Sequence, residues 1–136
     1  MLSDQASKEL ALRFLDERGS LALVPDIFHL TLVRNTGIAF GFFREHSALL
    51  FGLISLSLVV LFLWGLGLRE APRSARLGTA LILGGAVGNW IDRMRFGAVI
   101  DFLDFRVWPV FNVADTAISA GVILYLWVLC FKKKAP

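Results

Sequence analysis

The stretch Ser47–Leu68, SALLFGLISLSLVVLFLWGLGL, runs for 22 residues without a charged side chain. At about 1.5 Å of rise per residue it would form about 33 Å of helix, which matches the hydrocarbon thickness of a bilayer. The stretch therefore predicts a transmembrane helix, and with it a membrane protein.

The composition of the whole chain supports that class. Of the 136 residues, 57% are hydrophobic and only 18% are charged, and the mean hydropathy is +0.69. We expect one membrane-embedded domain spanning residues 1–136. The net charge of +3 comes from basic residues at the ends of apolar runs. This placement is typical of membrane orientation, so we expect no nucleic-acid partner.

Two further apolar stretches follow. Residues 113–131 are interrupted only by Asp115 and a few small polar residues. Residues 77–91 would cover only about 22 Å, so Arg76 and Asp92 would lie at or near the interfaces. The length of 77–91 would also suit a buried helix of a soluble protein. We expect a mainly α-helical, polytopic membrane protein with three evident transmembrane helices, at 47–68, 77–91 and 113–131.

Basic residues set the expected orientation. The linker 69–76 carries three arginines, and Lys132, Lys133 and Lys134 stand just before the last two residues. Both segments are predicted to be cytoplasmic, which places residues 1–46 and 92–112 on the outer face. The N-terminus would then also lie outside, a position that an additional first span would explain.

The outer segments predict a small β-sheet on the membrane rather than plain loops. Apolar and polar residues alternate around Phe28 and again around Val99, so we expect β or loop structure over 20–41 and 97–111. Ala6 to Arg18 predicts a short helix that Gly19 would end.

Two acids, Asp101 and Asp115, flank the short loop before the last apolar stretch. A carboxylate near hydrocarbon is costly unless it is paired, neutralised or used, so such acids are candidate functional residues. Two that converge on one membrane face suggest a pair sharing one proton.

Helical spacing adds polar groups to this pair. Gly85, Asn89 and Asp92 would share one face of their helix, and Asn112, Asp115 and Ser119 would share one face of theirs. A pocket lined by these groups is expected, because lipid cannot satisfy them. The neighbouring pair Gly84 and Gly88 would allow another helix to approach closely.

Other acids have structural interpretations. Asp104 would face away from Asp101 and form a solvated pair with Arg106, while Arg95 would neutralise Asp92. The whole set would also suit a membrane protein whose helices are held together by Asn and Asp side chains, with no chemistry.

Five blocks of the chain, in order, resemble lipoprotein signal peptidases (signal peptidase II). They are residues 4–8 (DQASK), 33–41 (VRNTGIAFG), 88–93 (GNWIDR), 99–102 (VIDF) and 111–115 (FNVAD). The family is a bacterial membrane aspartyl protease with four helices and a periplasmic β-sheet cradle. It removes the signal peptide of prolipoproteins just before a diacylglyceryl-modified cysteine.

The resemblance implies a role for each matching residue. Asp101 and Asp115 would be catalytic. Substrate-binding or pair-supporting roles would fall to Asn35, Gly37, Asn89, Arg93, Asn112, Asp4 and Lys8. No metal or other cofactor is implied. The expected partners are diacylglyceryl prolipoprotein signal peptides, membrane lipids and globomycin-like inhibitors. The expected location is the bacterial inner membrane, with the active site on the periplasmic face and the C-terminus in the cytoplasm.

One departure from the family keeps other functions open. The Asp-x-x-x-Lys block ends a first transmembrane helix in the family, whereas only three residues precede Asp4 here. A catalytically impaired relative that binds lipoprotein signal peptides is therefore an alternative. A proton-coupled membrane subunit is a third, which would need its acids at mid-membrane depth.

Overall fold

The computed structural model describes residues 1–17, 19–36 and 47–131. These residues form four helices and three strands. In chain order the elements are α1 (Leu2–Leu15), β1 (Ser20–Val24), β2 (Phe28–Asn35), α2 (Ser47–Leu66), α3 (Arg73–Phe96), β3 (Val99–Asp104) and α4 (Val113–Phe131).

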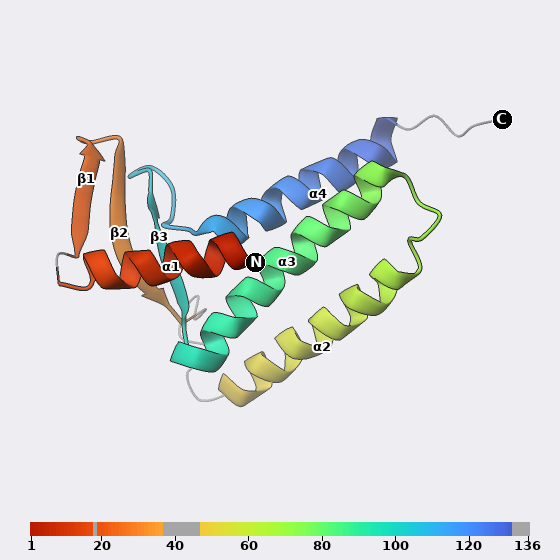
Figure 1. The fold of residues 1–136 in the computed structure, drawn as a ribbon, viewed down its shortest axis with the longest axis horizontal. Helices are drawn as coiled ribbons and strands as arrows, with labels where there is room; N and C mark the ends of the chain where they lie inside the picture. The colour runs from red at the N-terminus through yellow and green to blue at the C-terminus, as the bar shows by residue number, and fades with distance from the viewer. Residues whose placement is uncertain (18, 37–46, 132–136) are drawn as a thin grey trace.

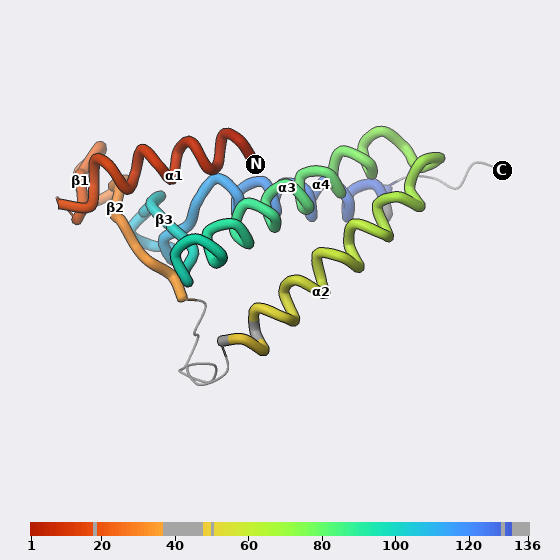
Figure 2. Tube along the Cα trace, turned by 60° about the horizontal axis from the view of Figure 1, so that its bottom comes forward, coloured from red at the N-terminus to blue at the C-terminus, as the bar shows by residue number. Residues whose placement is uncertain are grey.

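The three long helices lie beside one another, and α1 and the sheet lie together at one end (Figure 1). Helix α2 diverges from α3 toward that end, as the tube in Figure 2 shows. Helices α3 and α4 pack closely against each other, because the glycines at their contact have no side chains to separate the two backbones. A Cβ at Gly78 would lie 2.9 Å from the carbonyl oxygen of Gly121, and a Cβ at Gly121 would lie 2.6 Å from that of Gly78.

Gly85 provides a test of this helix contact. A Cβ at Gly85 would overlap the carbonyl oxygen of Ala114 and lie 2.8 Å from Ile118 Cγ1, whereas Gly84 has only the Met1 nitrogen, at 3.9 Å. We expect Gly85→Ala to lower the free energy of unfolding by about 1–3 kcal/mol, as overpacking does. Gly84→Ala, the matched control, should be neutral or stabilising because alanine favours helix. Thermal unfolding of both variants in detergent measures the difference, and equal melting temperatures would contradict it.

The sheet is antiparallel, with the order β1-β2-β3. Asn35 pairs with Val99, and Val33 pairs with Asp101, so the end of β2 lies beside the start of β3. Helix α1 packs on the sheet through Ala11 and Leu15, which form a buried core with Phe102. Helix α1 therefore covers the face of β3 that carries Phe102.

The sequence predicted the helices and the sheet correctly in kind, with differences at their ends. Helix α4 begins and ends as expected, and α3 is longer than 77–91. The first helix starts at Leu2 rather than Ala6, because Asp4 and Lys8 form a buried ion pair one turn apart within it. The expected close approach is found at Gly88 but not at Gly84, and Gly85 meets α4 in its place.

Within the described part of the chain, none of the helices combines the length and the apolar character needed to cross a membrane. The three transmembrane spans and their orientation therefore stay predictions. Lys132, Lys133 and Lys134 lie outside the described residues.

Candidate active site

The backbone after β3 brings the two acids together. Residues 105–110 form a loop, and backbone hydrogen bonds join the residues on its two sides. The N–H groups of Phe102 and Leu103 donate to the carbonyl of Phe111, and the N–H of Phe111 donates back to Leu103. The chain therefore returns to β3 just before α4 starts, and Asn112 lies beside Asp101.

Asp101 is buried on β3, with 2% of its surface exposed. Its Oδ1 accepts from Asn112 Nδ2 at 2.6 Å, and its Oδ2 accepts from Asn35 Nδ2 at 3.0 Å. Burial raises the pKa of the Asp101 carboxyl above its ordinary value, and the nearby Asp115 charge raises it further, against the lowering effect of the two amides. Removal from water disfavours the ionised form.

Asp115 is half-buried in the first turn of α4. Asn112 Oδ1 accepts the N–H of Asp115 at 2.9 Å, and Asp115 Oδ2 accepts the N–H of Asn112 at 3.2 Å. This reciprocal pair is a capping box, which satisfies two amides at the helix start. The positive end of the helix also favours a negative charge there.

Two asparagines connect the acids. Asn89 on α3 donates to Asp115 Oδ1 at 2.7 Å, and its own Oδ1 accepts from Asn112 Nδ2 at 3.1 Å. Because Asn112 also donates to Asp101, this one residue contacts both members of the pair. A carboxylate pair bridged in this way has fixed oxygen positions.

A buried charge cluster lies behind the asparagines. Lys8 Nζ is 3.0 Å from Asp4 Oδ2, 2.7 Å from Asp92 Oδ2 and 2.8 Å from Asn89 Oδ1. Lys8, Asp4 and Asp92 are each almost fully buried. The expected neutralisation of Asp92 by Arg95 is therefore wrong. Lys8 takes that place, because α1 packs against α3, and Arg95 approaches Glu9 at 3.7 Å.

Arg93 lies one turn beyond Asn89 on α3. Its NH1 group donates to the carbonyl of Asn89 at 3.2 Å. Its Nε is buried and has no hydrogen-bond partner among the described residues. The Arg93 guanidinium is attracted by the charges of Asp115, Asp92 and Asp101, so it adds positive charge beside the pair.

Asp104 forms the expected pair with Arg106, at 3.1 Å. The expectation that this acid is solvated is wrong, because Asp104 is 5% exposed. Thr31 donates to it at 2.8 Å, and so does the N–H of Arg106. These bonds lower the pKa of Asp104, the backbone bond from Arg106 most of all. Asp104 holds the loop rather than joining the Asp101/Asp115 pair.

An apolar pocket of 710 Å³ opens from Asp115 along α4. The aromatic residues Phe105, Trp108 and Phe111 line it opposite Ala120 and Ile123. The rings of Phe105 and Phe111 are stacked, with centroids 5.9 Å apart. The aromatic lining of this pocket was not predicted from the sequence, although the cluster of aromatic residues between the two acids could have indicated it.

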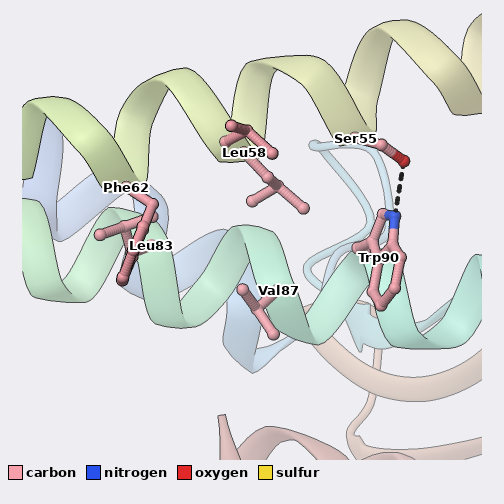
Figure 3. A pocket seen from close by; sticks show the side chains of 7 residues that line it. Ser55, Leu58, Phe62, Leu83, Val87 and Trp90 are labelled. Carbon is pink, nitrogen blue, oxygen red and sulfur yellow. Dashed lines mark hydrogen bonds between the residues drawn. The ribbon is translucent and has the colours of Figure 1, made fainter.

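A second apolar pocket, of 360 Å³, lies between α2 and α3. Leu58 and Phe62 of α2 point toward Leu83 and Val87 of α3 (Figure 3). At one end Trp90 donates to the hydroxyl of Ser55 at 2.9 Å, the dashed bond in Figure 3. Trp90 directly follows Asn89, so this pocket ends near the polar cluster.

The structure brings most of the predicted site residues together, and sequence reasoning missed one of their neighbours. Asp101, Asp115, Asn35, Asn89 and Asn112 are hydrogen-bonded to one another, with Asp4, Lys8 and Arg93 close by. Gly37 lies outside the described residues. Gln5 was missed, although it lies within the first family block. It donates to Asp92 at 2.8 Å and to the carbonyl of Gly88 at 3.1 Å.

Comparisons with known proteins agree with this arrangement. The family model for signal peptidase (SPase) II matches residues 1–131. A lipoprotein signal peptidase of Halothermothrix orenii is 41% identical over 132 residues, covering 93% of this chain and 89% of that protein. One from Moorella thermoacetica is 44% identical over 126 residues, covering 93% and 84%.

A solved structure described as a bacterial membrane enzyme, determined by the in meso method, has the same fold. It superposes with a TM-score of 0.83 at 28% identity, covering 97% of this chain and 88% of that one. The chain therefore belongs to the signal peptidase II family of proteases, which cleave signal peptides from prolipoproteins.

Proposed function

We propose that this protein cuts prolipoproteins as an aspartyl protease, with Asp101 and Asp115 as its catalytic dyad. The observation that carries the proposal is the bridge made by Asn112, which hydrogen-bonds both carboxylates. Two carboxylates held together cannot both ionise cheaply, so the dyad retains one proton across a range of pH.

The surroundings of the two acids support unequal roles. Asp101 is the more deeply buried, and its pKa is raised by that burial. Asp115 lies at the start of α4, where the helix dipole and the capping N–H favour its charge. We infer that Asp101 carries the proton that the dyad shares in the free enzyme.

The mechanism follows from those charges. The Asp115 carboxylate takes a proton from a water molecule as the water oxygen attacks the carbonyl carbon of the scissile peptide bond. Asp101 gives its proton to the developing oxyanion. The tetrahedral intermediate then collapses: its C–N bond breaks, the amine leaves with a proton from the dyad, and the signal peptide keeps the new carboxyl group.

Neighbouring groups would hold the substrate. The guanidinium of Arg93, with its buried Nε lacking a described partner, can donate to a substrate carbonyl. Asn35 and Gly37 are proposed to bind the peptide backbone, as the family blocks imply. Docking of the apolar parts of the substrate in the pockets beside α4 and between α2 and α3 would position one peptide bond at the dyad.

The proposed setting is the inner membrane of a bacterium. Helices α2, α3 and α4 would cross it, with the dyad at the outer face and the C-terminus in the cytoplasm. Three arginines in residues 69–76 and the final lysines support that orientation. The cut is proposed to fall just before the diacylglyceryl-modified cysteine, and globomycin-like cyclic peptides are proposed inhibitors that occupy the dyad.

Cleavage of a purified prolipoprotein tests the proposal. The chain, reconstituted in lipid, should release the signal peptide from diacylglyceryl-modified substrate and leave the unmodified precursor intact. A new N-terminal cysteine, identified by mass spectrometry, is the expected product. Binding of the modified substrate without turnover would instead identify the chain as the catalytically impaired signal-peptide binder.

A further inference from the structure

Two backbone amides next to the dyad are held by carboxylates from outside it. The N–H of Ala114, the residue before Asp115, donates to Asp4 Oδ1 at 2.8 Å. The N–H of Ile100, the residue before Asp101, donates to Asp92 Oδ2 at 3.1 Å. Each proposed catalytic aspartate therefore follows a residue whose backbone is tied to another acid.

Lys8 joins these two acids. Its Nζ lies 3.0 Å from Asp4 and 2.7 Å from Asp92, and it donates to Asn89 Oδ1 at 2.8 Å. An ammonium group has three N–H donors, so these three contacts use all of them. The third contact also fixes the Asn89 amide, because its oxygen faces Lys8 and its NH2 group must then face Asp115.

We propose that Lys8 is a positioning residue that sets the spacing between Asp101 and Asp115. Lys8 holds Asp92 and Asp4 in place. These carboxylates in turn accept the backbone N–H groups of the residues just before Asp101 and Asp115. Lys8 also orients Asn89, which donates to one member of the pair and accepts from the Asn112 amide that holds the other. The inference rests on the proposed function, since it explains how that dyad is kept in register.

The test must separate positioning from charge and from folding. Lys8→Met alone leaves two buried carboxylates without their cation and is expected to unfold easily. Lys8→Met/Asp92→Asn removes one positive and one negative charge, so the net charge of the cluster is unchanged. Gln5→Leu is the matched control, because Gln5 also donates to Asp92 and Asp4 yet has no bond to Asn89 among those described.

The first readout is kinetic. We expect the charge-balanced double variant to lower kcat about 100-fold, the loss typical of a misplaced catalytic group, with KM within about twofold of the wild type. Gln5→Leu should keep most of the wild-type kcat. A double variant that folds and keeps wild-type kcat would overturn the proposal, as would a change confined to KM.

The second readout needs no turnover, so it stands even if the proposed protease activity fails. The protonated dyad carboxyl gives an infrared C=O band, and the pH at which the band disappears reports how strongly the carboxylates repel each other. Charged groups that act on Asp101 are Asp115 on α4, Arg93 on α3 and Lys8 on α1, and Lys8 in turn contacts Asp92 and Asp4.

Wider spacing weakens the repulsion. In the charge-balanced variant we therefore expect the band to disappear at a lower pH than in the wild type, against the rise that loss of the Lys8 charge alone would cause. A purely structural role would leave only the rise caused by the lost Lys8 charge, so a midpoint that is unchanged or higher overturns the proposal. The proposed function is judged separately, by wild-type cleavage of lipidated substrate.

Discussion

Asp101→Asn and Asp115→Asn are each expected to lower cleavage of lipidated prolipoprotein by at least about 10³-fold while leaving the protein folded. An asparagine keeps the size of the aspartate but cannot take up a proton from water or pass one to the leaving amine. Rates should be measured in lipid with saturating substrate. Arg106→Gln, which breaks an ion pair with Asp104 on the loop rather than in the dyad, is the control. Full turnover in either aspartate variant would reject the proposed mechanism.

Stability against pH shows whether the lost activity reflects chemistry or unfolding. Burial raises the pKa of Asp101, so ionisation of this acid costs folding free energy. The cost is absent below the unfolded pKa and is fully present above the raised folded pKa. The Asp101→Asn variant has no charge to bury at this position, so it avoids the cost. The melting temperature of Asp101→Asn minus that of the wild type should therefore increase from about pH 4 to about pH 8.

Asn112→Ser is expected to lower the rate about 100-fold, because misplacement of catalytic groups typically has an effect of this size, and to lower the free energy of unfolding by about 1–3 kcal/mol, because buried acceptors lose their donor. Serine is as good an N-cap as asparagine, so α4 keeps its first turn. The serine hydroxyl is too short to replace Nδ2, which lies 2.6 Å from Asp101 and 3.1 Å from Asn89. The bridge between the two acids is then lost.

Asn112→Ala separates the two roles of this residue. Alanine lacks both the cap and the bridge, and Asn112 is fully buried. We expect the rate to match that of Asn112→Ser, while the free energy of unfolding falls by a further ~1 kcal/mol. Chemical denaturation in detergent and initial cleavage rates measure both. If Asn112→Ser cleaves at the wild-type rate, the amide bridge has no part in catalysis.

Local patterns were sufficient for much of the site. The spacing of Asn112 and Asp115 predicted that both belong to the start of one helix, and the structure makes them a capping box. The five family blocks marked Asn35, Asn89 and Lys8 as well. The sequence patterns could not show which charged side chains pair with each other. Arg95 is close to Asp92 in the chain, yet Lys8, from a helix far earlier in the sequence, binds it.

The helices could be predicted without coordinates, because long uncharged runs and helical spacing of small and polar residues are local properties. The family could also be recognised from the sequence, since the five matching blocks occur in the family's order. The position of Lys8 behind both aspartates, and the closure of the loop after β3 beside α4, follow from the packing of the folded chain. Such contacts depend on how α1 packs over the sheet and α3, and burial makes each ion choose a partner by position in space rather than in sequence.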